Sequence, residues 1–407
     1  MTAGSATRLY RSGDSPSSWL TGRLDGRLLA LAVLCAAAAG VFILVLHARV
    51  FGQRLTFPLD LEWMEGGVLV HAYRIAQGRP IYGPPGLDFI PFLYPPLYPT
   101  LLAALGAVFP LGYTLGRAVS LVALALACAT LLWVCVGLTR ERKPRWMAGL
   151  VGIAGAGAVV SGFTFSGSFY DLVRVDSLVL ALEALALALG LRGKSWRTGV
   201  VAGLAMALAF FTKQTAAIVG VGLGLGLLVM NWRRGVCYGL TAAVAVGAGL
   251  VLLNWTTGGW YWTYTYQLHQ AHSFEAERAF RAGGWALVRE TWPLLASSMF
   301  AVSLLAWRRA LRRADALVAI VAVSGVAAGL VGLGTKWAYA NALIPAVFFP
   351  SFASAYYCVR LLAVPAAGDV RLARSVRRRV SVFLDPFVDG GVRGAQGRVG
   401  TLVHDAG

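Results

Sequence analysis

The chain has 407 residues, of which 58% are hydrophobic and only 13% are charged, and its mean hydropathy is +0.67. This composition is typical of a polytopic membrane protein and argues against a soluble domain. The formal net charge of +18 would suggest a nucleic-acid partner in a soluble protein. Here Lys and Arg form short runs between apolar segments, where they set membrane topology, so nucleic acid is excluded as a partner.

The first part of the chain predicts one span and one long loop. Residues 1–27 are polar and basic, and we expect a cytoplasmic arm. The first span runs from about residue 28 to 46, and residues 51–116 form the first outer loop. Within this loop the apolar run 97–109 is too short to cross a hydrocarbon core of about 30 Å at about 1.5 Å per residue, so we expect a helix lying in the membrane interface.

Nine further apolar segments bring the predicted number of transmembrane helices to about ten. They are about 117–138, 147–165, 176–191, 198–212, 215–231, 236–254, 292–306, 315–333 and 341–362. Several are short, which indicates a locally thinned bilayer or helices shielded by neighbours. The fold class is therefore all-α, with a polytopic domain over residues 28–362, interfacial helices in the first outer loop, and an Arg-rich cytoplasmic tail without stable structure over residues 363–407.

The basic clusters test this count. With ten crossings, five clusters fall on the side of the N-terminus: 140–145, 192–197, 233–234, 308–313 and the residues from 360 onward. The positive-inside rule is then met at every loop, provided that residues 97–109 do not cross. This topology predicts a multi-pass protein of the inner (plasma) membrane with both termini in the cytoplasm.

The first outer loop carries acidic residues between two apolar spans. Asp60, Glu62 and Glu65 lie in L-D-L-E-W-M-E-G, and Asp88 follows. A carboxylate half-withdrawn from water has a raised pKa, which suits a general base that takes the proton of a sugar or lipid hydroxyl. The alternative is a solvated loop or a helix start, where acidic residues cap the N-terminus.

The later outer turns carry cations. Arg174 and Asp176 open one span, Lys213 lies between two spans in F-F-T-K-Q-T, and Lys336 and Asn341 occur in G-T-K-W-A-Y-A-N. Three cations at one membrane surface suit a phosphate or diphosphate carried by a lipid. The alternatives are a membrane-edge ion pair and snorkelling lysines. Chemistry on one side only favours an enzyme over a carrier, which must present its site to both sides.

The sequence gives little support for a bound metal. His269, His272 and Glu275 have a spacing that invites a metal site, but a surface helix explains them and nothing else completes a ligand set. The five cysteines lie in or beside apolar segments without C-x-x-C spacing, so neither a disulfide framework nor a zinc site is predicted.

Together, these motifs resemble the integral-membrane glycosyltransferases of the GT-C fold. The resemblance lies in the acidic first outer loop, Y-P-P-L-Y before the second span, Arg-x-Asp at the next outer turn, F-T-K-Q-T, and G-T-K-W-A-Y-A-N-A-L-I-P near the end. The order of the motifs is similar to that in bacterial relatives of the protein O-mannosyltransferases and aminoarabinose transferases, over about residues 55–350.

The resemblance implies that a sugar passes from a polyprenyl-phosphate donor, in a single inverting displacement, to a cell-envelope glycan, lipid or protein acceptor at the outer face. It assigns the base to Glu62 or Glu65, with Asp60 as a third candidate; the donor phosphate to Arg174, Lys213 and Lys336; and the acceptor or a metal to Asp176 and Asn341. No cofactor is certain, and a divalent metal, Mg or Mn, is left open. The chain has Asp-x-Glu-x-x-Glu where the mannosyltransferases have an adjacent Asp-Glu pair, so the resemblance does not decide which acid acts.

Two other classes of function are kept as alternatives. A transporter or flippase of lipid-linked or amphipathic substrates predicts two-sided access and often two related halves, and the sequence shows no clear internal repeat. A non-catalytic membrane scaffold is disfavoured, because such a protein has no need for acidic residues and lysines within or beside its spans.

Overall fold

The computed structural model describes residues 16–139 and 145–364, with side chains from residue 27 onward. This part of the chain is helical and contains no strand beyond one isolated antiparallel bridge between Phe274 and Thr335. Residues 1–15 of the basic arm, the cluster at 140–144 and the tail from residue 365 lie outside the described residues. The domain boundaries that depend on them stay predictions.

Each of the ten predicted apolar segments coincides with one long helix. These are α1 (Pro16–Leu55), α4 (Tyr113–Gly137), α5 (Arg145–Ser161), α6 (Asp176–Arg192), α7 (Trp196–Thr212), α8 (Ala216–Met230), α9 (Trp232–Thr256), α12 (Gly284–Trp307), α13 (Arg313–Gly334) and α14 (Ile344–Ala363). Within the described residues, five stretches are long and apolar enough to cross a membrane: Arg27–Leu55, Tyr113–Gly137, Trp232–Thr256, Arg313–Gly334 and Ala340–Ala363. The all-helical fold is confirmed, and ten crossings stay a prediction.

Short helices fill the connections. They are α2 (Met64–Ala76), α3 (Leu97–Leu105), α10 (Trp260–Trp262), α11 (Leu268–Gln270), the π-helices η1 (Thr263–Gln267) and η2 (Glu277–Gly283), and the 3-10 helix η3 (Ala340–Leu343). The expected interfacial helix over 97–109 ends earlier, at Leu105, and its length of about 14 Å is far below the thickness of a hydrocarbon core. It lies between α2 and α4 in the chain and is too short to cross a membrane by itself.

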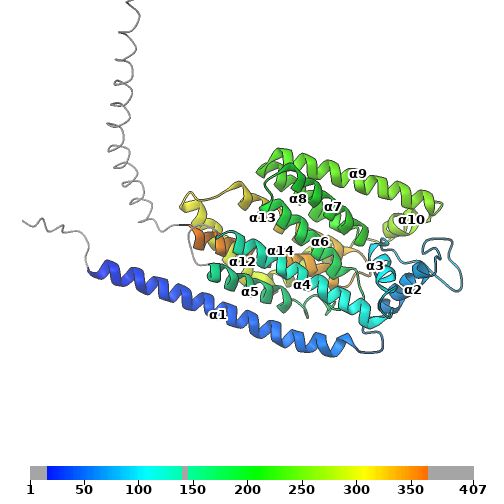
Figure 1. Cartoon of the computed structure of the whole chain (residues 1–407), viewed down its shortest axis with the longest axis horizontal. Helices are drawn as coiled ribbons and strands as arrows, with labels where there is room; N and C mark the ends of the chain where they lie inside the picture. The colour runs from blue at the N-terminus through cyan, green and yellow to red at the C-terminus, as the bar shows by residue number, and fades with distance from the viewer. Residues whose placement is uncertain (1–15, 140–144, 365–407) are drawn as a thin grey trace, which may run out of the picture.

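Helix α14 lies at the centre of the bundle and packs against α13, α12 and α5 (Figure 1). Its side chains Phe348, Phe349 and Phe352 are almost fully buried and join the main apolar core. Helices α1 and α9 lie along opposite edges in Figure 1 and bury few of their apolar residues. Such helices need an apolar solvent, as a bilayer provides.

Glycine lets the edge helix α1 approach its neighbour. A Cβ atom on Gly157 of α5 would lie 2.5 Å from the Cα of Gly40 in α1. Between helices in lipid, packing depends on such close backbone contact because lipid tails are as apolar as the side chains.

The turns that carry the predicted site residues meet at one end of the bundle, which we call the cavity end. Arg54 at the end of α1 bonds Asp171, and Glu65 of α2 accepts from the backbone of Val173. Asp176 at the start of α6 receives hydrogen bonds from two further turns. The prediction that these turns share one end of the bundle is confirmed, and the side of the membrane on which this end lies stays a prediction.

Candidate functional site

A cavity of about 370 Å³ opens at the cavity end. Segments from six parts of the chain line it: Trp63 and Met64; Pro91–Tyr94; Arg174; Lys213–Thr215; His269 and His272; and residues of α13 and the turn after it, including Thr335–Tyr339, Asn341 and Ala342. Arg174, Lys213, Lys336 and Asn341, which come from three separate turns, are thus brought together. Three cations are among the polar side chains that line the cavity, so the cavity suits an anionic ligand.

The loop before α6 holds Arg174 and Asp176 in place because it is itself buried. Leu172 and Val173 are buried, and Ser120 of α4 donates a hydrogen bond to the carbonyl of Leu172 at 2.6 Å. A buried loop must have its backbone groups satisfied in this way. The two charged side chains are therefore presented by a rigid segment.

Asp176 is the hub that joins the turns. Its Oδ1 accepts hydrogen bonds from Lys213 Nζ at 2.6 Å and from Asn341 Nδ2 at 3.0 Å. Its Oδ2 lies 3.8 Å from Arg174 Nε and has no hydrogen-bond partner in the part of the chain that the structure describes. Asp176 was predicted to serve an acceptor or a metal, and the structure places it beneath the cavity, where it holds Lys213 and Asn341.

Glu62 lies beside the cavity and is only partly paired. Its Oε2 accepts from Arg174 Nη1 at 3.1 Å and from the backbone of Met64, while its buried Oε1 has no hydrogen-bond partner within residues 16–139 and 145–364. Burial raises the pKa of Glu62 above its ordinary value, although the Arg174 guanidinium opposes the shift. Glu62 itself does not line the cavity; its neighbours Trp63 and Met64 and its partner Arg174 do. A carboxylate with a raised pKa and an unpaired oxygen is the combination that a general base needs.

Glu65 is fully buried and fully paired. Arg117 Nε and Nη2 donate to its two oxygens at 3.0 and 2.8 Å, and the backbone amides of Val173 and Leu61 donate as well. Burial alone would raise its pKa, but these hydrogen bonds outweigh burial and lower the pKa. The remaining donors of Arg117 bind the carbonyls of Arg54, Phe57 and Leu59. Glu65 and Arg117 thus fix the entry of the first outer loop.

Asp60 and Lys336 lie at the surface. Asp60 is exposed, and its Oδ1 accepts from the backbone amide of Gly66 at 2.8 Å, as an acid at a helix start does. Lys336 is exposed and, within the described residues, forms no ion pair; its Nζ lies 5.4 Å from the ring centre of Trp337. Trp337 has φ of +68°, which costs about 1 kcal/mol or more and is typical of functional loops.

The cavity also includes residues that sequence reasoning missed. Tyr94 accepts a hydrogen bond from Arg174 Nη2 at 2.9 Å, and Gln214 Nε2 donates to the carbonyls of Leu93 and Thr265. Gln214 directly follows Lys213, so the F-T-K-Q-T motif could have pointed to it. Nothing in the sequence indicates the partner of Tyr94, which lies 80 residues away.

His269 and His272 line the cavity as well, with ring centres 6.0 Å apart. Burial lowers the pKa of His269, whose ring nitrogen lies 3.1 Å from the carbonyl of Leu93, so the ring is neutral near pH 7. Within residues 16–139 and 145–364, no three His, Cys, Asp or Glu side chains come close enough to hold a metal ion. The two rings are therefore treated as part of the cavity wall.

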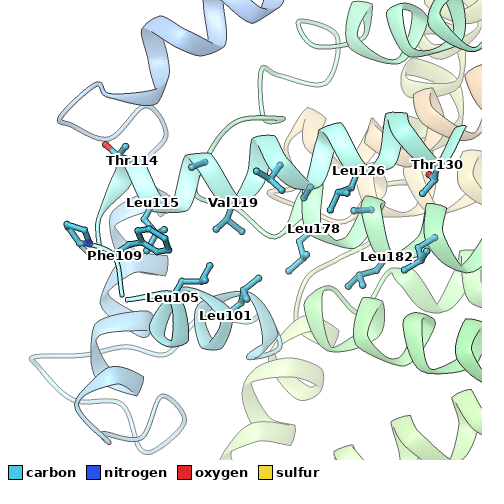
Figure 2. Close-up of a pocket in the computed structure, with 16 residues that line it drawn as sticks. Leu101, Leu105, Phe109, Thr114, Leu115, Val119, Leu126, Thr130, Leu178 and Leu182 are labelled. Carbon is cyan, nitrogen blue, oxygen red and sulfur yellow. The ribbon is translucent and has the colours of Figure 1, made fainter. Parts of the chain in front are cut away.

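A second, larger cavity of about 900 Å³ lies between α3, α4 and α6 (Figure 2). Leu101 and Leu105 of α3 face Val119 and Leu126 of α4 across it, and Leu182 of α6 closes one side. Of the described residues that line it, none is charged, and Thr114 and Thr130 are the ones with polar side chains. This cavity can bind hydrocarbon and cannot perform proton transfer.

The chain is similar to known proteins in sequence and in fold. The model of glycosyltransferase family 87 matches residues 92–333, a range that includes Arg174, Asp176 and Lys213. A crystal structure of ArnT from Cupriavidus metallidurans bound to undecaprenyl phosphate superposes with a TM-score of 0.53 at 15% identity, over 92% of this chain and 66% of ArnT. The apo structure of ArnT gives 0.54 at 17% identity, over 86% of this chain and 64% of ArnT. The chain thus spans slightly less than two thirds of ArnT, and no curated protein matches its sequence.

Proposed function

The chain belongs to glycosyltransferase family 87, and from this premise we propose that it transfers a sugar from a polyprenyl-phosphate donor to an acceptor hydroxyl. It is a membrane glycosyltransferase with an ArnT-like fold of the GT-C type, so the family that the motifs predict is confirmed. What we propose beyond the family is the identity of the donor, the roles of the reacting residues and the side of the membrane on which the reaction takes place.

One observation carries the proposal: Arg174, Lys213 and Lys336 lie on separate turns yet line one cavity. Lys336 forms no ion pair with a described residue, whereas Arg174 pairs with Glu62 and Asp176, and Lys213 pairs with Asp176. A phosphate brings the negative charge that this cavity needs. The ArnT structure bound to undecaprenyl phosphate supports a polyprenyl phosphate as the ligand.

Glu62 is the proposed base. The donor phosphate competes for Arg174, and as the guanidinium turns toward the phosphate it releases the carboxylate of Glu62 toward the cavity. Losing this cation raises the pKa of Glu62 further, which makes Glu62 a stronger base. Glu65 and Asp60, the other two predicted bases, are assigned to holding the loop and starting α2, because their oxygens already accept backbone or Arg117 hydrogen bonds.

The reaction is a single displacement at the anomeric carbon of the sugar. The acceptor hydroxyl loses its proton to Glu62, and its oxygen forms a bond to the anomeric carbon. The bond between that carbon and the phosphate oxygen breaks, and polyprenyl phosphate leaves with the bonding electron pair. The anomeric configuration inverts, and Arg174, Lys213 and Lys336 stabilise the charge that grows on the leaving phosphate.

The arrangement in the membrane follows from the same proposal. The cavity end faces the outer side, with the predicted basic clusters and both termini on the cytoplasmic side of the inner membrane. The apolar cavity between α3, α4 and α6 takes up hydrocarbon of the lipid-linked substrate. The acceptor is a hydroxyl of the cell envelope. Asp176 acts by holding Lys213, and Asn341 acts by holding Asp176.

The test compares two carboxylates three residues apart. Purified wild-type, Glu62→Gln and Glu65→Gln proteins are assayed for transfer from polyprenyl-phosphate sugars, and their thermal unfolding is measured. We expect Glu62→Gln to unfold normally and to lose about 10²–10⁴-fold in kcat, which is the usual contribution of a general base. Glu65→Gln should unfold at lower temperature, since Arg117 loses its charged partner, yet retain activity per folded molecule. Normal kcat in Glu62→Gln would eliminate Glu62 as the base.

A further inference from the structure

One buried acidic residue has no part in the proposed reaction. Glu183 lies two turns after Asp176 in α6 and is only 2% exposed. Among the described residues, its Oε2 has no hydrogen-bond partner. It also forms no salt bridge within the described part of the chain, and Lys213 lines the same small recess as Glu183.

Stability does not explain a glutamate at this position. Burying a polar group without a hydrogen-bond partner costs free energy, and in a membrane span an ionisable residue marks a functional site by default. Most other residues of α6 near Glu183, such as Leu180, Ala184 and Leu187, are apolar and buried. A leucine at position 183 would match them, so the carboxyl group needs another explanation.

Glu183 faces a recess of about 10 Å³ directly beneath the reaction cavity. Asp176, Glu183, Lys213 and Thr215 line the recess, together with apolar residues of α6 and the start of α14. Lys213 and Thr215 line the reaction cavity as well, so they form the partition between the two spaces. Helical side chains lean toward the N-terminus of their helix, which directs Glu183 toward Asp176 and Lys213.

The hydrogen-bond inventory of the recess matches one water molecule. A space of about 10–15 Å³ holds one water, which needs two to four polar partners. Two buried oxygens here have no partner, Asp176 Oδ2 and Glu183 Oε2, and a water can donate one proton to each. Lys213 Nζ has three protons, and it donates one of them to Asp176 Oδ1. It can donate the second to the oxygen of this water. The third can then be donated to a ligand in the reaction cavity.

We propose that Glu183 is a positioning residue, which binds a water in the recess and through it holds the Lys213 ammonium at the cavity floor, facing the donor phosphate. This inference rests on the proposed function for the identity of the ligand. Glu183 touches neither the donor nor the acceptor, and its effect is on the affinity for the donor.

The experiment is a double-mutant cycle of Glu183→Leu and Lys213→Met, with Glu183→Gln as the conservative variant and Glu277→Gln as the control. Glu277 is exposed and pairs only with Arg281 among the described residues, so its change should leave the kinetics unaltered. We expect Glu183→Leu to raise the KM for the polyprenyl-phosphate sugar about tenfold, with kcat and the acceptor KM nearly unchanged, because a hydrogen bond to a charged group is lost. Glu183→Gln keeps an oxygen for the water and should stay within about threefold of wild type.

The cycle separates positioning from a purely structural role. If Glu183 acts through Lys213, Glu183→Leu should hardly raise the donor KM further when Lys213 is already replaced by Met. The unfolding temperature of the Glu183→Leu single variant should equal or exceed that of wild type, because an unpaired buried carboxyl is removed. An unchanged donor KM in Glu183→Leu, or effects that add fully in the double variant, would overturn the inference. If wild-type protein uses no polyprenyl-phosphate sugar at all, the proposed function fails instead.

Discussion

Two buried ionic clusters lie at opposite ends of helix α13, and they differ in how completely they are paired. At its start, Asp315 accepts four hydrogen bonds on its two carboxylate oxygens, from Arg360, Tyr356 and the backbone of Arg312. At the cavity end, the cluster of Glu62, Arg174 and Asp176 leaves one atom of each side chain without a hydrogen-bond partner. A helix of 22 residues, about 33 Å long, separates the two.

The difference indicates which cluster holds structure and which performs chemistry. A buried polar atom without a partner costs about 1–3 kcal/mol, and a stable cluster therefore pairs every atom. The Asp315 cluster meets this condition, as does the Glu65–Arg117 pair. Unpaired atoms beside a cavity indicate that a ligand supplies the missing partners. Substitutions at the first kind of cluster should therefore change stability, and substitutions at the second kind should change ligand binding.

The largest expected effect is on stability, at the fully paired cluster. Asp315→Ala leaves the buried Arg360 without its partner and should lower the free energy of unfolding by about 3–5 kcal/mol. Donor KM and kcat per folded molecule should not change. Tyr357→Phe removes one hydrogen bond to the Asp315 carbonyl and should cost about 1 kcal/mol. Denaturant unfolding measures both, and a stable Asp315→Ala protein with altered KM would reverse the assignment.

At the incompletely paired cluster, removing one charged side chain should weaken binding of the donor. Lys213→Met should raise the donor KM about 10–100-fold, since a charged hydrogen bond to the phosphate is lost. Lys194→Met is the matched control, because Lys194 is exposed in the turn between α6 and α7, away from the cavity. Steady-state kinetics at varied donor concentration measures the effect. Equal KM values in the two variants would contradict a phosphate site at Lys213.

A smaller effect concerns pH. Burial raises the pKa of Glu62 and Arg174 opposes that shift, so Arg174→Gln should raise the pKa further. A base must be deprotonated to act, so activity falls as pH drops through its pKa. The acidic limb of the kcat/KM profile, which reports the free enzyme in which Arg174 pairs with Glu62, should therefore move to higher pH. A limb that stays in place, or moves to lower pH, would show that Glu62 does not control it.

The smallest effect is expected at the apolar cavity. Leu182→Trp fills part of the space between α3, α4 and α6 and should raise the KM a few-fold for donors with long prenyl chains. Donors with one or two prenyl units should be unaffected. Leu204→Trp, on an exposed part of α7, serves as the control. Equal effects on short and long donors would exclude this cavity as the binding site of the chain.

Most of the fold could be predicted, because a helix that lies in lipid needs a continuous run of apolar residues, which is visible in the sequence. Ten apolar runs predicted ten helices, and the short run at 97–109 contains a separate short helix, whose predicted place in the membrane interface stays a prediction. The ends were less predictable: α1 continues to Leu55, well past the expected end near residue 46. The helix continues through polar residues and Gly52, and it ends three residues before Pro58, which cannot continue a helix.

The site could be predicted only in part. Charge and position within turns were enough to group Arg174, Lys213 and Lys336, which the structure brings to one cavity. Pairing was not predictable: Arg117 was expected only as the start of a span, and it bonds Glu65 across 52 residues. A sequence pattern shows that a carboxylate is costly in its segment and does not show which cation offsets that cost, so Glu62 and Glu65 could not be distinguished.

The most direct test of the central claim follows the donor itself. Purified protein is reconstituted into lipid vesicles with a polyprenyl-phosphate sugar and acceptor lipids, and mass spectrometry measures intact donor, free polyprenyl phosphate and new glycoside. If the protein is this transferase, donor is consumed and polyprenyl phosphate and glycoside appear in equal amounts. Donor that remains intact, or that crosses the vesicle membrane without cleavage as a flippase would move it, would contradict sugar transfer by this protein.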